Sequence, residues 1–168
     1  MSAQRIEVDE GAQHGRVRLR LRNMQVEDVP RIAVIDARAY EFPWTPGIFS
    51  DCLRAGYTAM VLEDDDGVVG YAIFTVSAHE AHLLNVCVVP ERQGEGCGRR
   101  LVKRVLDLAR WQRCERVFLE VRPTNVHAIA LYHDLGFNEI AARPRYYPAR
   151  DGAREDATVM ALELLAPE

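Results

Sequence analysis

Hydrophobic and polar positions along the chain predict about seven strands and four main helices. Residues 16–22, RVRLRLR, alternate strictly between basic and apolar side chains, which predicts a strand with Val17, Leu19 and Leu21 facing the core and its arginines in solvent. Apolar or alternating runs predict the other strands, at 57–63, 68–77, 83–89, 116–121, 137–142 and 157–165. Apolar spacings of three and four residues predict helices over 26–40, from Pro46 onward, over 99–112 and over 125–135.

The segments between these elements carry residues typical of caps and turns. Thr45 can cap the second helix, and Thr124 or Asn125 can cap the fourth. The acidic segment 64–67 predicts a hairpin turn and not a metal site, because its consecutive carboxylates lack the glutamate that completes an EF-hand loop. The Arg- and Tyr-rich segment 142–156 is predicted to be a long connecting loop, and loops of that length are more often functional than not.

The passage from the strand at 83–89 into the following helix is the most informative stretch. A proline ends the strand, and Gly94, Gly96 and Gly98 alternate just before the helical pattern. Glycines there let backbone N–H groups approach an anion at the positive end of the helix dipole, so the turn is a candidate phosphate site. A plain strand-to-helix turn is the alternative. The next strand, at 116–121, is predicted to lie parallel to the first through a right-handed crossover.

Composition and charge narrow the class of protein. At 168 residues and 48% hydrophobic content, the chain is expected to form a single domain over 16–168, preceded by a mobile arm at 1–15. A net charge of −4 does not favour a nucleic-acid surface. The scattered cysteines predict reduced core thiols and no metal site. No apolar run suits a membrane span or a signal peptide, so a cytoplasmic protein without a membrane partner is expected.

Several motifs together resemble the GCN5-related N-acetyltransferases (GNAT). A Gln-x-x-Gly-x-Gly turn follows the strand NVCVVP, and a helix ending Leu-Tyr precedes Leu-Gly-Phe. Within that family FPWT, HLLNVCVVP, LEVRPTN, AIALY, LGF, RYYP and EDATVM are similar to the bacterial ribosomal-protein-alanine N-acetyltransferases of the RimI group. The resemblance implies an α/β fold: a mixed, mostly antiparallel sheet of about seven strands with four main helices. Its central parallel strand pair would splay into a cleft.

The resemblance also implies a reaction and the residues that perform it. Acetyl-CoA would be the cosubstrate, no metal would be needed, and the acceptor would be a protein N-terminal amine, foremost the N-terminal alanine of a small-subunit ribosomal protein. Glu120 would be the general base and Tyr132 the general acid. Cofactor contacts are implied at Val86, Cys87, Val88, Gly94, Glu95, Gly96, Cys97, Gly98, Arg99 and Asn125. Acceptor contacts are implied at Phe42, Trp44, Arg145, Tyr146 and Tyr147.

The chemistry of amine acetylation supports both roles independently. An α-amine has a pKa near 7.7–8.0, so much of it must lose a proton before it attacks a thioester, and a carboxylate at a strand end can take that proton. The departing thiolate resembles that of cysteine, and a tyrosine within reach can protonate it. From the residues alone, Glu120 could instead pair with Arg122 or another neighbour, and Tyr132 could be a core aromatic.

Other functions stay open at this stage. Glu120 lies about twenty residues after the glycines, where a dinucleotide-binding oxidoreductase places its ribose-binding acid. Arg99 and Arg100 stand where the last glycine of that pattern belongs, which counts against this class. The same scaffold could also bind coenzyme A without turnover, or acetylate other N-termini or lysine side chains.

Overall fold

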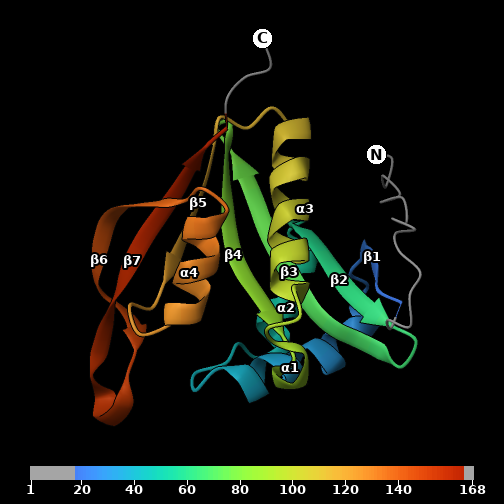
Figure 1. The fold of residues 1–168 in the computed structure, drawn as a ribbon. Coiled ribbons are helices and arrows are strands. Elements are labelled where there is room, and N and C mark those ends of the chain that lie inside the picture. The colour runs from blue at the N-terminus through green and yellow to red at the C-terminus, as the bar shows by residue number, and fades with distance from the viewer. Residues whose placement is uncertain (1–17, 165–168) are drawn as a thin grey trace. The chain divides into compact units, whose positions relative to one another are not determined.

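The computed structural model describes residues 18–164, which contain a mixed sheet and four α-helices (Figure 1). The strands are β1 (Arg20–Asn23), β2 (Thr58–Asp64), β3 (Gly67–Ser77), β4 (Glu80–Val88), β5 (Arg116–Val121), β6 (Asn138–Pro148) and β7 (Arg154–Glu163). The helices are α1 (Val29–Ala39), α2 (Pro46–Arg54), α3 (Cys97–Trp111) and α4 (Val126–Asp134). Short 3-10 helices lie at Val26–Asp28, Pro90–Arg92 and Arg150–Gly152.

The strands are hydrogen-bonded in the order β1-β2-β3-β4-β5-β7-β6. Strand β1 is antiparallel to β2, and β7 is antiparallel to both β5 and β6. Strands β4 and β5 are parallel, in a register that pairs Glu80 with Arg116 and Leu83 with Leu119. This confirms the predicted mixed, mostly antiparallel α/β sheet with a parallel pair at its centre.

The parallel ladder is shorter than either of its strands. Its last pair is Leu83 with Leu119, although β4 continues to Val88 and β5 to Val121. The last two residues of β5, Glu120 and Val121, pair only with β7. The ladder between β4 and β5 therefore ends at Leu83, and the cleft between the strand ends stays a prediction.

Contacts divide the described chain into two compact units. The first comprises 18–73 and Asn85–Val102, and the second comprises Phe74–Leu84 and 103–164. Both have a buried apolar core. The largest fully buried side chains of the first unit are Ile32, Ile35, Phe49, Met60, Leu62, Tyr71, Ile73 and Leu101. Those of the second unit are Phe74, Phe137, Leu119 and Met160. The single domain stays a prediction, and the predicted arm at 1–15 lies outside the described residues.

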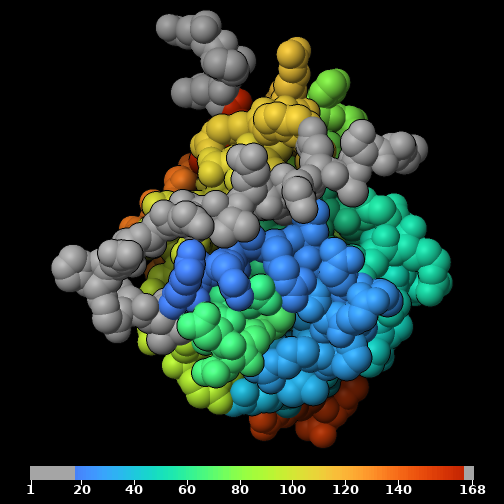
Figure 2. Space-filling view, turned by 90° about the vertical axis from the view of Figure 1, so that its right-hand side faces the viewer, coloured from blue at the N-terminus to red at the C-terminus, as the bar shows by residue number. Residues whose placement is uncertain are grey.

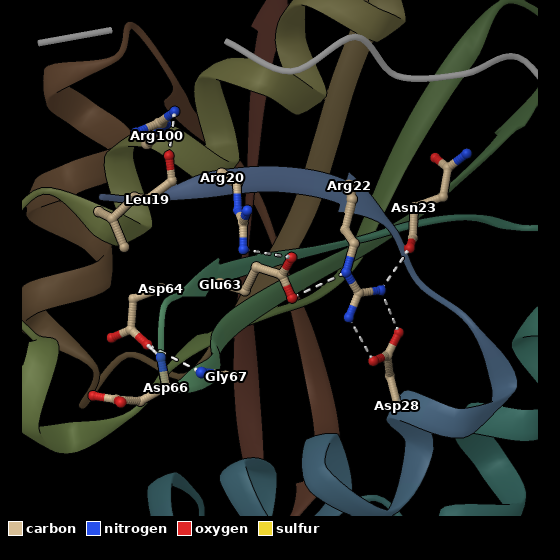
Figure 3. Close-up of polar contacts among 10 residues, drawn as sticks. All are labelled: Leu19, Arg20, Arg22, Asn23, Asp28, Glu63, Asp64, Asp66, Gly67 and Arg100. Atoms are coloured by element: carbon tan, nitrogen blue, oxygen red, sulfur yellow. Dashed lines mark hydrogen bonds and ion pairs between the residues drawn. The ribbon is translucent and has the colours of Figure 1, made fainter. Parts of the chain in front are cut away.

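Strand β1 begins later than its alternating pattern predicted, and Val17 lies outside the described residues. Leu21 is buried as expected, and β1 lies at the surface beside the turn between β2 and β3 (Figure 2). Its arginines are not simply solvated. Arg20 and Arg22 form ion pairs with Glu63, at 3.6 and 3.1 Å, and Arg22 also hydrogen-bonds both oxygens of Asp28 (Figure 3). These pairs tie β1 to its neighbours.

The prediction of a long loop at 142–156 is wrong, because most of that segment is strand. Strand β6 runs to Pro148, β7 starts at Arg154, and the two pair along their length (Figure 1). Register shifts accommodate the irregular residues: one of them spans Pro144 and Arg145, the latter with φ +53°. β6 is an edge strand, so a proline and a bulge disrupt pairing on one side only.

The predicted caps and the hairpin turn are confirmed. The Thr45 side chain accepts a hydrogen bond from the Ile48 amide, and α2 begins at Pro46, directly after Thr45. Asn125, and not Thr124, caps α4. In the acidic turn Asp64 accepts hydrogen bonds from the amides of the turn itself, at 2.8 and 3.1 Å (Figure 3). Local chemistry therefore determines these boundaries.

Candidate active site

Glu120 is a buried carboxylate near the end of β5. The strand alternates between buried and partly exposed residues, and Glu120 shares the partly exposed face with Phe118, yet its own side chain is only 4% exposed. One oxygen, Oε2, contacts Nε2 of His82 on β4. The other, Oε1, lies 3.3 Å from Nη2 of Arg143 on β6. The alternative partner considered from sequence, Arg122, pairs with Glu155 instead, at 2.8 Å.

The two oxygens of this carboxylate differ in how they are satisfied. Oε1 is buried and, among the described residues, makes no hydrogen bond, although Arg143 is within ion-pair distance. The two observations are compatible because an ion pair needs only proximity, whereas a hydrogen bond needs a donor aimed at a lone pair. A buried carboxylate oxygen that no donor points at can accept a hydrogen bond from a bound molecule.

His82 lies beside Glu120, a contact that the sequence did not predict. Its ring stacks on that of Phe118, with centroids 4.3 Å apart and planes 17° apart. The same two residues are register partners in the β4–β5 ladder. The parallel crossover was predictable, but only the register shows that a histidine of β4 lies beside a carboxylate of β5.

Tyr132 lies in α4 and is buried, with its ring 5.7 Å from that of Phe137. Burial raises the pKa of Tyr132 above its ordinary value, so the hydroxyl keeps its proton at neutral pH. Within residues 18–164 this hydroxyl makes no hydrogen bond. Asn125 at the start of the same helix uses Oδ1 to accept from the amide of Ala128, at 3.3 Å, which leaves its amide nitrogen as a donor.

Two tyrosines of β6 lie near Glu120. The rings of Tyr146 and Tyr147 meet edge to face, 4.8 Å apart, and the guanidinium of Arg122 lies 4.4 Å from the centre of the Tyr147 ring. Burial is the main cause that raises the pKa of both tyrosines, and the negative charge of Glu120 adds to it. Arg145 is exposed, as Tyr146 is, and its backbone amide donates to Oδ1 of Asp156, at 2.9 Å.

The glycine turn belongs to the first unit. Gly94 and Gly96 have φ of +80° and +87°, a conformation that other L-residues adopt only with strain. No described atom lies within 4 Å of where their Cβ atoms would be. The amides of residues 94–98, including Glu95 and Cys97, donate to no other backbone group of the described chain. Arg99 follows in the first turn of α3. The turn thus presents free donors beside open space.

The predicted pantetheine contacts at Val86, Cys87 and Val88 lie on β4 beyond the parallel ladder. Two of their carbonyls already have partners: the Tyr40 hydroxyl donates to Val86 O, at 2.8 Å, and the Gln93 side chain donates to Val88 O, at 3.2 Å. A further pantetheine hydrogen bond would therefore use amides, or the remaining lone pairs of these carbonyls.

The predicted acceptor residues Phe42 and Trp44 follow α1 in the first unit, and Arg145–Tyr147 belong to the second. The loop at Trp44 is anchored by a buried carboxylate of α1, Asp36, which the sequence did not single out. Asp36 is 1% exposed, and its Oδ2 accepts from the Trp44 amide, at 2.7 Å. Its Oδ1 accepts from the Tyr71 hydroxyl and from the Asn85 side chain.

Comparison with known proteins identifies the family. The model of the acetyltransferase (GNAT) family matches residues 20–137. The chain belongs to the GNAT family. It is 38% identical over 142 residues to the [ribosomal protein bS18]-alanine N-acetyltransferase of Escherichia coli, covering 84% of this chain and 95% of that protein. The GNAT fold and acetyltransferase activity therefore replace the oxidoreductase alternative.

Solved structures agree with this assignment. The crystal structure of the bS18-alanine N-acetyltransferase from Escherichia coli superimposes with a TM-score of 0.82 at 37% identity, covering 90% of this chain and 97% of that one. The structure of yncA from Salmonella typhimurium, solved with its cofactor acetyl-CoA, has a TM-score of 0.72 at 25% identity, covering 89% and 95%. The fold of the GNAT enzymes thus extends over most of the chain.

Two further properties concern the described residues alone. Between residues 18 and 164, no three His, Cys, Asp or Glu side chains gather as they would around a metal ion. No helix in that range has both the length and the apolar character needed to cross a membrane.

Proposed function

We propose that this protein transfers the acetyl group of acetyl-CoA to the N-terminal amine of another protein, with the N-terminal alanine of a small-subunit ribosomal protein as its main acceptor. The observation that carries the proposal is the 38% identity to an enzyme named for that reaction, over 84% of this chain and 95% of that protein. Such an acceptor is made in the cytoplasm, so we infer that the protein works there. Neither nucleic acid nor a membrane is needed for the reaction.

The glycine turn suits the pyrophosphate of acetyl-CoA. Its amides are free within the described chain, open space surrounds Gly94 and Gly96, and the dipole of α3 adds positive potential at the same end. Val86–Val88 on β4 and Asn125 would hold the pantetheine arm. Bound acetyl-CoA supplies an activated acyl group in the form of a thioester.

Glu120 is the proposed general base. The acceptor amine is largely protonated near neutral pH, and it attacks the thioester carbonyl only after it loses a proton. Oε1 of Glu120 is the group suited to take that proton, because it is buried and without a hydrogen bond among the described residues. The proton is received by Glu120 directly or through a water molecule.

Tyr132 is the proposed general acid. Its hydroxyl stays protonated because burial raises the pKa of Tyr132, and no described residue engages the hydroxyl. It can donate to the sulfur of coenzyme A as the C–S bond breaks, which stabilises the leaving thiolate. Base and acid come from adjacent elements of the second unit, β5 and α4.

On the acceptor side, we assign Phe42 and Trp44 in the first unit and Arg145, Tyr146 and Tyr147 in the second to contacts with the peptide. Arg143 links these rings to the proposed base, because its Nη2 lies 3.3 Å from Oε1 of Glu120 and its Cζ lies 5.8 Å from the centre of the Tyr146 ring, which packs on Tyr147. Two rings beside a buried carboxylate suit a short N-terminal side chain with its ammonium group turned toward the carboxylate.

The proposal is tested by incubating the protein with acetyl-CoA and peptides that differ only in their first two residues. A matched peptide carries a blocked N-terminus and an internal lysine. Tandem mass spectrometry locates each added acetyl group, and a thiol reagent follows release of coenzyme A. We expect acetylation of the α-amine, fastest on alanine, and no modification of the blocked peptide. Acetylation of internal lysines with alanine termini ignored would overturn the proposed acceptor but not the membership of the family.

A further inference from the structure

The carboxylate of Glu120 has two basic partners that differ in rigidity and exposure. We propose that His82 is a positioning residue that holds Oε2 permanently, and that Arg143 is an exchangeable counter-ion that the ammonium group of the acceptor replaces at Oε1. This inference rests on the proposed function and gives roles to two residues to which the family resemblance assigned none.

The contact with His82 is built into the sheet. His82 and Phe118 are register partners in the β4–β5 ladder and their rings are stacked, so the imidazole is held by both backbone pairing and packing. Phe118 and Glu120 point to the same face of β5, two residues apart. The imidazole therefore contacts Oε2 from a position that the sheet holds rigid. With Nε2 protonated it donates to that oxygen and orients the carboxylate, leaving Oε1 for the acceptor.

The contact with Arg143 has the opposite character. The arginine is on the edge strand β6, beside a register shift, and its side chain is 52% exposed. It lies 3.3 Å from Oε1 but gives that oxygen no hydrogen bond, and it rests over the Tyr146 ring at 5.8 Å. The arginine side of the pair is exposed and makes no hydrogen bond to Oε1, and the incoming ammonium group keeps the buried carboxylate compensated, so the exchange has a small cost. An ammonium group can supply the missing hydrogen bond.

Charge is conserved in this exchange, because one cation replaces another beside the same carboxylate. The other charged or titratable groups around Glu120 are Tyr146 and Tyr147 of β6, and Arg122, which is paired with Glu155. Arg143 is thus the movable charge at this carboxylate. When the acceptor ammonium has passed its proton to Oε1, the attacking amine is neutral and the proton resides on Glu120.

Kinetics of three variants, one at Arg143 and two at His82, test the proposal with any amine acceptor that the wild type turns over. Arg143→Gln should lower the acceptor KM about twofold to fivefold, since a competing cation is gone, with kcat little changed. His82→Leu should lower kcat by on the order of tenfold to a hundredfold, the effect of a displaced reacting group. His82→Gln, which retains an N–H donor, should restore most of that loss.

Matched controls are available in the same unit. Arg116→Gln removes an arginine of β5 that pairs with Glu163, and His133→Gln removes a half-exposed histidine of α4. Both should leave acceptor KM and kcat unchanged. A raised acceptor KM in Arg143→Gln would overturn the exchange, because Arg143 would then bind the acceptor. Equal losses in His82→Leu and His82→Gln would overturn the positioning role.

A measurement without an acceptor separates this inference from the proposed function. In protein labelled with 15N-histidine, the His82 Nε2 signal should be that of a protonated, hydrogen-bonded nitrogen. It should change in Glu120→Gln and stay the same in Arg143→Gln. An unchanged signal in Glu120→Gln would refute the contact itself, whichever peptides or lysines the wild-type protein acetylates.

Discussion

Asp36 accepts a hydrogen bond of 2.7 Å from the backbone amide of Trp44, so a buried carboxylate of α1 holds the loop that we assign to the acceptor. The same carboxylate accepts from the Tyr71 hydroxyl on β3 and from the Asn85 side chain on β4. All three partners are donors, and together they use both oxygens. The network joins the acceptor loop to the strand that we assign to the cofactor.

Asp36→Asn is expected to weaken both the fold and the binding of the acceptor. The amide keeps the size of the carboxylate but turns an NH2 group toward a donor, which costs about 1–3 kcal/mol of unfolding free energy. The acceptor KM should rise more than the acetyl-CoA KM, because the Trp44 loop loses its anchor. Thermal unfolding and steady-state kinetics measure the two effects. Asp28→Asn, at a carboxylate paired with Arg22 (Figure 3), is the control: it should leave acceptor KM unchanged.

Gly96→Val is expected to raise the acetyl-CoA KM about tenfold or more in a protein that still folds. The φ of +87° strains any side chain at this position, and the new methyl groups occupy the open space where the pyrophosphate would lie. Gly56→Val is the matched control, since its φ is +78° and its surroundings are equally open. Both variants should lose similar thermal stability. If the acetyl-CoA KM rises equally in the two variants, or does not rise in either, the turn holds no phosphate.

Glu120→Gln is expected to lower kcat/KM by roughly 10²-fold to 10⁴-fold near neutral pH. The loss should shrink as the pH rises, because the acceptor amine then loses its proton without a base. Measurement of kcat/KM of the wild type and the variant from pH 6 to 10 gives the loss near neutral pH and its change with pH. A loss of the same size at every pH would mean that Glu120 is not the base.

Tyr132→Phe is expected to lower kcat on the order of 10²-fold while the acetyl-CoA KM changes little. No described residue hydrogen-bonds the hydroxyl, so its removal should hardly alter the melting temperature. The comparison variant Tyr71→Phe removes a hydroxyl that does bond to Asp36, and should melt earlier. Because burial raises the pKa of Tyr132, the group stays protonated below that raised value, and the wild-type rate should not fall between pH 8 and 10 on its account. Near-normal turnover of Tyr132→Phe would assign the acid elsewhere.

Much of this protein could be predicted from short stretches of sequence. The period of apolar residues located the helices and most strands. Thr45 and Asn125 marked helix starts, and two glycines of the turn, Gly94 and Gly96, occur where φ is positive. These features depend on neighbours along the chain, whose backbone conformations and hydrogen bonds act over a few residues. The motifs that led to the GNAT family are local in the same sense.

The partners of the buried charges could not be predicted in this way. Glu120 meets His82 and Arg143 only because strand register brings β4, β5 and β6 side chains to one place. Asp36 finds its donors on three other segments, and the segment 142–156 became strand because an edge position tolerates its proline and bulge. Sequence by itself determined the helices, most strands, the short turns and the family. Tertiary structure decided which charges are paired, because a side chain far along the chain becomes a neighbour only after the sheet has formed.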